Sequence, residues 1–344
     1  MEEQNFKISS AVHPRVGMIG SGSWATALIK MLLDNSVPKT IRWWVRNEET
    51  AEHLRRYGNN PNYLSAVSLD EVAPEHILTD ARKVIQQSDI VILNTPATYL
   101  KNALKEVAPE DFQGKTVVSA IKGIVPQENQ IVGDYLQDQY GIALSQIAVV
   151  GGPCHAEEVA QERLSYLTIA SSEEETTRQV AELLKTRYIN TILSPDVYGI
   201  EYAAVLKNIY AVAGGICHGI GFGDNFQAVL VSNAIREMEH FIQKTHPMER
   251  NIMDSAYLGD LLVTSYSQFS RNRTFGNMIG KGYSVTSAQL EMNMVAEGYY
   301  ASNCIQSISS RNEFELPICD AVYNILHLHK SPKSEMNKIA ETFN

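Results

Sequence analysis

Apolar residues in the first half of the chain fall into short continuous runs, separated by stretches with helical spacing. The runs are rich in Val, Ile and Thr, a composition typical of strands buried on both faces. Helical patterns such as 24–33 and 179–186 lie between most of them. This alternation predicts an α/β fold with a mostly parallel, doubly wound sheet covered by helices. The expected strands are residues 15–19, 40–45, 89–94, 116–120, 147–150, 165–170 and 188–193.

The pattern changes after residue 194. Strand-like runs give way to long helical stretches rich in Ala, Leu, Ile and Met. Pro195 and Asp196 interrupt the pattern, and an aspartate at this place is a good cap for the next helix. A chain of 344 residues is also longer than one hydrophobic core usually serves. We therefore expect an α/β domain over residues 1–195 and an all-helical domain over residues 196–344.

Composition narrows the classes of function. The formal net charge of −10 argues against nucleic-acid binding and against an acidic membrane surface. The first ten residues, MEEQNFKISS, lack the features of a signal peptide, and no run approaches the roughly 20 apolar residues of a membrane helix. The four cysteines are widely spaced, without a C-x-x-C pair. We expect a reduced, cytoplasmic protein with no integral membrane segment.

The segment GSGSWA at residues 20–25 follows the first expected strand and opens a helix. Gly20 permits a tight turn, Gly22 lets a pyrophosphate approach the backbone, and Ala25 allows close packing of helix on strand. The free N–H groups at the start of the helix attract phosphates. The segment therefore predicts a Rossmann-type dinucleotide site, with a plain strand–helix turn as the alternative.

The end of the second expected strand bears on the choice between NAD and NADP. An acidic residue there would bind the ribose 2′-hydroxyl, whereas a guanidinium suits a 2′-phosphate. Arg46 and Asn47 occupy this place, and Glu48 follows. The residues favour NADP(H) modestly over NAD(H), with an exposed arginine at a strand end as the alternative.

Polar residues also follow three later strands of the first half. Asn94-Thr95-Pro96, Lys122 and the Gly152 region each come directly after an expected strand. Ligands of parallel sheets bind outside the carboxyl ends of the strands. We expect these segments to face one crevice, although each alone is also compatible with an ordinary loop.

Lys207 is the most unusual residue of the helical half. It lies in AVLKNIYA, within a run from Gly199 to Gly223 whose other charged side chains are sparse. Burial lowers the pKa of a lysine, and such a lysine exchanges protons near neutral pH. The alternatives are a pair with Glu201, which the spacing disfavours, or a side chain that extends into solvent.

Two further polar positions stand out. Asp260 lies in the apolar stretch YLGDLLVTSYS, where a helix N-cap after Gly259 is the alternative to a site carboxylate. Residues 270–273, SRNR, are either a phosphate clamp or a solvated loop. No zinc or calcium ligand pattern occurs, and His327 and His329 are expected at the surface.

These segments together resemble one family, the NAD(P)-dependent glycerol-3-phosphate dehydrogenases of the soluble bacterial type. The resemblance covers residues from about 15 to 325 and rests on blocks that occur in the family's order. The long block around Lys207 is the most specific. The blocks are GSGSWATAL, IKG, GGPCHAEE, LKNIYAVAGGICHGIGFGDN, LGDLLVT, SRNRTFG and VAEGY.

The resemblance implies a role for each matching position. Lys207 corresponds to the proton acceptor, with Lys122 and Asp260 beside it in the catalytic group. Cys154 stands where the family commonly has Ser or Thr, which puts one hydroxyl contact in doubt. The implied cofactor contacts are Gly20, Gly22, Ser23, Trp24, Arg46, Lys122, Ala156, Arg271, Val295 and Glu297. The implied substrate contacts are Lys122, Gly152, Cys154, Lys207, Asn208, Asp260, Ser270, Arg271 and Asn272.

The family further implies reversible hydride transfer between NAD(P)H and dihydroxyacetone phosphate, which gives glycerol 3-phosphate for phospholipid synthesis. It also implies a small phosphorylated triose as substrate, a homodimer, and a helical domain similar to that of 6-phosphogluconate dehydrogenase. Two alternatives stay open: another lysine-dependent dehydrogenase of the β-hydroxyacid type, and a non-catalytic dinucleotide sensor.

Overall fold

The computed structural model describes residues 14–37, 39–267, 270–292 and 296–343. Within these residues, the strands form an eight-stranded sheet in the order β10-β9-β8-β5-β4-β1-β2-β3 and a small hairpin of β6 and β7. The strands of the main sheet are β1 (Arg15–Ile19), β2 (Thr40–Trp44), β3 (Ile77–Leu78), β4 (Ile90–Leu93), β5 (Thr116–Ser119), β8 (Ile147–Gly151), β9 (Ser165–Ala170) and β10 (Ile189–Ser194).

The main sheet is mostly parallel, as predicted. Neighbouring strands from β3 to β8 run in the same direction, and β9 and β10 are parallel to each other. The β8–β9 pair is antiparallel. All seven expected strands are present within one or two residues of their predicted limits, while β3 and the hairpin of β6 (Ile124–Val125) and β7 (Gln130–Ile131) were not predicted.

The strands β1, β4 and β8 are buried along nearly their whole length, which indicates that helices cover both faces of the central part of the sheet. Along the chain, helices separate the parallel strands β1, β2, β4 and β5, as in a doubly wound fold. The predicted fold class is therefore confirmed. These helices are α1 (Ser23–Asp34), α2 (Glu48–Tyr57), α3 (Ala81–Gln86), α4 (Leu100–Ala103), α5 (Val132–Tyr140), α6 (Ala156–Ala160) and α7 (Glu174–Leu184).

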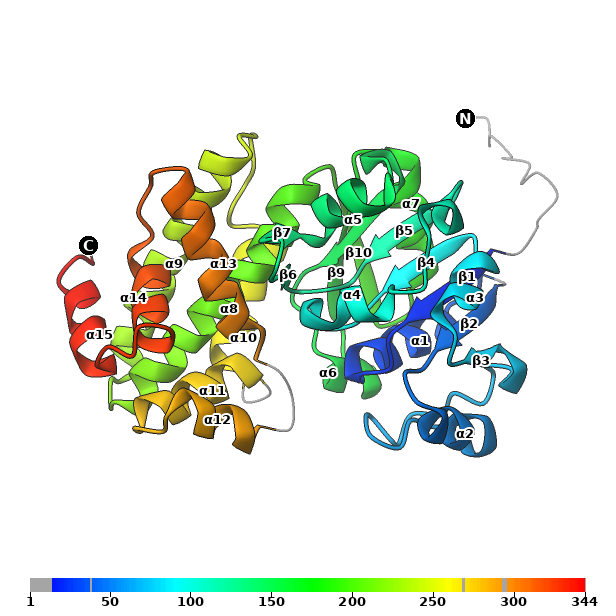
Figure 1. Cartoon of the computed structure of the whole chain (residues 1–344), viewed down its shortest axis with the longest axis horizontal. Coiled ribbons are helices and arrows are strands. Elements are labelled where there is room, and N and C mark those ends of the chain that lie inside the picture. The colour runs from blue at the N-terminus through cyan, green and yellow to red at the C-terminus, as the bar shows by residue number, and fades with distance from the viewer. Residues whose placement is uncertain (1–13, 38, 268–269, 293–295, 344) are drawn as a thin grey trace.

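The chain becomes helical directly after β10 (Figure 1). Asp196 accepts a hydrogen bond from the Gly199 N–H at 2.9 Å and caps the next helix, as expected. The domain limit between residues 195 and 196 falls in this turn, and as a domain boundary it stays a prediction. The helices are α8 (Val197–Gly219), α9 (Asp224–Thr245), α10 (Asp260–Tyr266), α11 (Arg271–Gly280), α12 (Val285–Glu291), α13 (Glu297–Arg311), α14 (Pro317–Leu326) and α15 (Pro332–Ala340).

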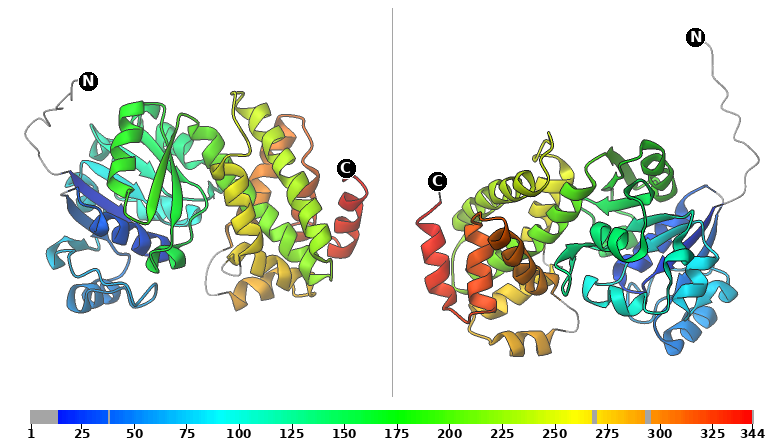
Figure 2. Two further views of the ribbon diagram at one scale, coloured as in Figure 1. Left: turned by 180° about the vertical axis from the view of Figure 1, so that it is seen from behind. Right: turned by 45° about the horizontal axis from the view of Figure 1, so that its top comes forward.

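The helical part packs against one end of the sheet part, with β2 and β3 on the far side (Figure 2). Helix α8 runs from the sheet into the middle of the helical part, where it is buried along nearly its whole length. Its apolar side chains form a core with those of α9, α13 and α14. The apolar run noted in the sequence is therefore the central helix of this part.

Helix α11 approaches α8 so closely that side chains would not fit between the two backbones. A Cβ atom at Gly276 would lie 2.1 Å from the Val212 carbonyl oxygen, and one at Gly215 would lie 2.1 Å from that of Arg273. Gly215 and Gly219 of GGICHGIG thus have a packing role, because a Cβ at Gly219 would likewise lie 2.5 Å from the Asn277 carbonyl oxygen of α11. They bring the start of α11, residues 270–272, near Lys207.

We predict that Gly276→Ala lowers the free energy of unfolding by about 2 kcal/mol, because the added methyl group forces the two helices apart. Urea denaturation measures the change. Gly223→Ala is the control, since a Cβ at Gly223 meets nothing within 4 Å. Equal losses for the two variants would contradict the role of Gly276 in close helix packing.

Candidate active site

The glycine loop after β1 has the geometry that the motif predicts. Gly20 has a φ of +137°, and a Cβ there would lie 2.3 Å from the Asn94 carbonyl oxygen at the end of β4. Only glycine combines this backbone conformation with so close an approach. A Cβ at Gly22 would meet nothing within 4 Å. Gly22 therefore leaves open space in front of the start of α1.

Two side chains that the sequence did not single out hold this loop. The indole N–H of Trp43, from β2, donates to the Gly20 carbonyl at 2.6 Å. The amide of the fully buried Asn60 donates to the Ser21 carbonyl at 3.0 Å and to the Thr26 hydroxyl at 2.9 Å. The loop is therefore rigidly placed before any ligand enters.

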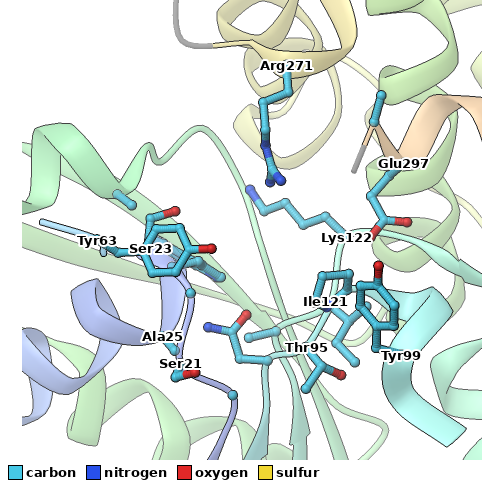
Figure 3. A pocket seen from close by; sticks show the side chains of 18 of the residues that line it. Ser21, Ser23, Ala25, Tyr63, Thr95, Tyr99, Ile121, Lys122, Arg271 and Glu297 are labelled. Carbon is cyan, nitrogen blue, oxygen red and sulfur yellow. The ribbon is translucent and has the colours of Figure 1, made fainter. Parts of the chain in front are cut away.

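A cavity of about 780 Å³ lies between the sheet part and the helical part. It runs from the glycine loop, past the carboxyl ends of β2, β4, β5 and β8, to α8, α10 and α11. Figure 3 shows Ser23 and Tyr63 on one side of the cavity and Tyr99 and Glu297 on another. In the same view, Arg271 and Lys122 extend toward each other from opposite parts of the structure.

Lys207 and Asp260 form a buried ion pair at the wall of this cavity. The Lys207 Nζ lies 2.5 Å from Oδ1 of Asp260, and both side chains are less than a tenth exposed. The other carboxylate oxygen, Oδ2, lies 3.5 Å from the Nζ of Lys122. Lys122 also donates to the Gly152 carbonyl at 3.0 Å. One carboxylate thus serves two lysines, and the pairing of Lys207 with Glu201 is wrong, as is its extension into solvent.

Burial lowers the pKa of Lys207 to about 7. The Asp260 carboxylate opposes this shift, because it stabilises the ammonium form, and the nearby Lys122 adds to it by repulsion. A lysine with such a pKa is able to give and to take a proton near neutral pH.

Asp260 is held in place by contacts at the start of α8. A single π-helical turn, Ser255–Gly259, directly precedes Asp260. In this turn, the Tyr257 hydroxyl donates to Asp196 at 2.6 Å, and Arg250 donates to the same carboxylate at 2.8 Å. Since Asp196 caps α8, the segment with Asp260 is tied to the helix with Lys207. The alternative, in which Asp260 is an N-cap, is wrong, because Gly259 is the N-cap residue of α10 and the Asp260 carboxylate binds the lysines.

The SRNR segment is the first turn of a helix and not a solvated loop. Ser270 caps α11 by accepting a hydrogen bond from the Arg273 N–H. Arg271, the first residue of α11, is exposed and lines the cavity. The ten-residue helix thus presents its positive end and a guanidinium at one place, an arrangement that suits a phosphate.

Asn208 and Asn272 connect the walls of the cavity by a chain of amide hydrogen bonds. The Asn208 amide donates to the Lys122 carbonyl at 2.8 Å, and its oxygen accepts from Asn272 at 2.8 Å. The Asn272 oxygen in turn accepts from the Gly298 N–H at 2.9 Å. These amides hold α8, α11 and α13 against the end of β5.

Glu297, the first residue of α13, crosses to the sheet part. Its carboxylate accepts from the Ala97 N–H at 3.3 Å, just after β4. Burial raises the pKa of Glu297 to about 7, against the opposing effects of Arg271 and of the Ala97 N–H.

The structure brings nearly all predicted site residues to this one cavity. Gly152 does not line it, although its carbonyl binds Lys122. Val295 lies outside the described residues. Burial raises the pKa of Cys154 to about 12, so this residue presents a neutral thiol. The predicted residues that line the cavity are Gly20, Gly22, Ser23, Trp24, Arg46, Lys122, Cys154, Ala156, Lys207, Asn208, Asp260, Ser270, Arg271, Asn272 and Glu297.

Asn94 and Thr95, at the end of β4, line the cavity, as expected for this strand end. The Asn94 amide nitrogen and the Thr95 hydroxyl are buried, with no hydrogen-bond partner among the described residues. Tyr63, Tyr99 and Tyr300 also line the cavity. Tyrosines in irregular segments or within helices have no motif that would reveal them.

The residues present fit a dinucleotide. The open space at Gly22, the start of α1 without a capping side chain, and the unsatisfied donors of Asn94 and Thr95 all face one cavity. Such groups match a diphosphate and its riboses.

Comparison with known proteins identifies the family. The model of the NAD-dependent glycerol-3-phosphate dehydrogenase N-terminus matches residues 15–177, and that of the C-terminus matches residues 196–337. The chain belongs to this dehydrogenase family. A relative from Salinibacter ruber, named glycerol-3-phosphate dehydrogenase (NAD(P)+) 2, is 32% identical over 94% of this chain and 93% of its own. A relative from Exiguobacterium sp., named glycerol-3-phosphate dehydrogenase (NAD(P)+), is 33% identical over 94% of both chains.

Solved structures share the fold. The glycerol-3-phosphate dehydrogenase of Coxiella burnetii has a TM-score of 0.88 at 23% identity, covering 96% of this chain and 99% of its own. A D-mandelate dehydrogenase has a TM-score of 0.60 at 13% identity, covering 93% and 99%. The fold alone therefore extends to other dehydrogenases, but the family models and the curated relatives do not favour the β-hydroxyacid or sensor alternatives.

Among the described residues, no group of three or more His, Cys, Asp or Glu side chains is placed to hold a metal ion. Across the same residues, no helix has the length and apolar character needed to cross a membrane.

The two histidines expected at the surface differ in exposure. His327 is half-buried and hydrogen-bonded to Ser302 at 3.0 Å, whereas His329 is exposed, so the expectation is right for His329 alone.

We predict that Asp260→Asn lowers the free energy of unfolding by about 3 kcal/mol, because it removes the carboxylate from a buried ammonium group. Asp254→Asn is the control, since Asp254 is exposed six residues earlier in the chain. Urea denaturation at pH 6, where Lys207 is charged, measures both. Similar small effects of the two substitutions would contradict the structural weight of the Lys207–Asp260 pair.

Proposed function

We propose that this protein reduces dihydroxyacetone phosphate to glycerol 3-phosphate with NADPH or NADH, and catalyses the reverse oxidation. The observation that carries the proposal is the Lys207–Asp260–Lys122 cluster, which lies in the same cavity as the glycine loop and the start of α11. A sensor would need the glycine loop but not this cluster. Family membership supports the substrate, since the relatives are named for it.

The nicotinamide supplies the hydride chemistry at C2 of the substrate. The chain's own residues then supply binding, orientation and proton transfer. In reduction, Lys207 gives a proton to the C2 oxygen, and in oxidation it takes that proton. Lys122 orients the same oxygen, and Asp260 keeps both ammonium groups in place.

The phosphate of the substrate is held away from the reacting carbon. We assign this role to Arg271 and to the N–H groups at the start of α11, with Ser270 and Asn272 shaping the turn. A guanidinium binds two phosphate oxygens at once. This remote binding would hold C2 within reach of Lys207, and thereby lower the entropic part of the barrier.

We further propose a preference for NADP(H). Asn47 caps α2, and Glu48 pairs with Arg55 and does not line the cavity. Arg46 is therefore the charged residue of this strand end that faces the cavity, where it suits a 2′-phosphate. The ratio of kcat/KM for NADPH and NADH measures this preference. The homodimer and the cytoplasmic location stay predictions of the sequence.

We predict that the purified protein consumes NADPH or NADH when dihydroxyacetone phosphate is added, which the absorbance of the reduced nicotinamide measures. Lys207→Met lowers kcat by about 10³-fold or more, because proton transfer loses its donor, while the dissociation constant of the coenzyme changes little. Coenzyme binding by the wild type without turnover of the triose phosphate would refute the enzymatic function.

The lowered pKa of Lys207 predicts opposite pH profiles for the two directions. Reduction needs the protonated lysine, so its kcat/KM is constant below about pH 7 and falls as the pH rises through that value. Oxidation needs the neutral lysine, so its kcat/KM rises through the same range and then levels off. Profiles with the same sign in both directions would exclude Lys207 as the proton-transfer group.

A further inference from the structure

A buried glutamate joins the helical part to the sheet part at a place outside the cavity. Glu201 is in the second turn of α8 and is 3% exposed. Its carboxylate accepts from the Gly133 N–H, at 3.0 Å to Oε2 and 3.3 Å to Oε1. Gly133 is the second residue of α5, which follows the β6–β7 hairpin on the side of the sheet part that faces α8 (Figure 1).

This contact takes the place of a helix cap. The N-cap residue of α5 is Ile131, whose side chain has no acceptor for the N–H groups of the first turn. The acceptor comes instead from a residue 68 positions later in the chain, on another part of the structure. A Cβ at Gly133 would lie 2.7 Å from Glu201 Oε2, so the absence of a side chain there is what admits the carboxylate.

Neighbouring contacts fix the same crossing point. The Ile200 side chain lies against Gly151 at the end of β8, where a Cβ would lie 2.5 Å from its Cγ2 atom. Burial raises the pKa of Glu201 to about 8, with the Gly133 N–H opposing and Asp134 adding to the shift. At neutral pH the side chain is therefore mostly a neutral carboxyl, which a glutamine resembles in shape and charge.

The other polar crossings described above lie in the cavity itself. Lys122 with Asp260, Asn208 with the Lys122 carbonyl, and Glu297 with Ala97 all involve residues that line it. Glu201 and Gly133 do not line it. Their contact therefore does not compete with a ligand.

We propose that Glu201 is a positioning residue that anchors α8 to the sheet part and so sets the place of Lys207 relative to the coenzyme. Lys207 follows six residues later, about 9 Å along the same helix. The glycine loop and Lys122 belong to the sheet part, whereas Lys207 belongs to the helical part. An error of about 1 Å between such groups lowers a rate by about 100-fold. This inference rests on the proposed dehydrogenase activity.

The test compares Glu201→Ala with Glu237→Ala. Glu237 is likewise buried, and it caps α14 by accepting from the Ile318 and Cys319 N–H groups at 2.7 and 3.0 Å. Both partners of that contact lie within the helical part. Glu237 therefore matches Glu201 in chemistry, but its contact does not join the helical part to the sheet part. Both variants are expected to lower the thermal midpoint.

We predict that Glu201→Ala lowers kcat by about 10-fold or more, while the KM for dihydroxyacetone phosphate and the dissociation constant of NADPH change less than about threefold. Glu201→Gln restores kcat to within about threefold of the wild type, since its amide oxygen accepts from Gly133. Glu237→Ala keeps kcat within about twofold. An equal loss of kcat in the two alanine variants, or no recovery with glutamine, would overturn the inference.

Gly133→Ala provides a second route if Glu201→Ala does not fold. The added methyl group displaces the Glu201 carboxyl without changing Glu201, and the higher helix propensity of alanine offsets part of the cap that α5 loses. We expect the same loss of kcat, and no further loss when Gly133→Ala is added to Glu201→Ala. A wild-type kcat in Gly133→Ala, or full additivity, would also overturn the inference. Absence of turnover in the wild type would refute the proposed function instead.

Discussion

The arrangement of the site depends on stabilising the buried ammonium group of Lys207 within an apolar helix. Burial of an ammonium group is costly unless a carboxylate accompanies it, and here Asp260 lies 2.5 Å from Lys207. Asp260 must in turn be held in place. The π-helical turn that precedes it is tied to the Asp196 cap of α8 by hydrogen bonds from Tyr257 and Arg250. The opposing effects of burial and pairing leave Lys207 with a pKa near the pH at which proton transfer is useful.

The cluster is assembled from both parts of the chain. Lys122 follows β5 of the sheet part, while Lys207 and Asp260 belong to the helical part. The chemistry therefore depends on how firmly the parts are joined. Within the cavity, amide and carboxylate bonds join them through Asn208 and Glu297. Outside it, Glu201 does so at the start of α5, where no ligand interferes.

Close helix packing completes the site from the other side. Glycines on α8 and α11 let the two backbones approach within the space that a methyl group would need. This approach places Ser270, Arg271 and Asn272 near Lys207, so that a phosphate group and a reacting carbon are able to occupy one cavity. The glycine-rich stretch GGICHGIG is part of one of the blocks that resemble the family. Its glycines on α8 are needed for close packing against α11, which local sequence patterns do not reveal.

The sequence by itself determined the seven predicted strands, the turn from strand to helix at Gly20, the helical character after Asp196 and the family. Each depends on neighbouring residues: continuous apolar runs, helical spacing or a positive φ that glycine tolerates. The tertiary structure alone decided which residues meet. Lys207 pairs with Asp260, 53 positions away, and not with the nearer Glu201, which caps α5. β3, Asn60 and the tyrosines of the cavity also escaped prediction. Such contacts follow from how helices pack and from which buried charge lacks a partner, and neither is encoded in local periodicity.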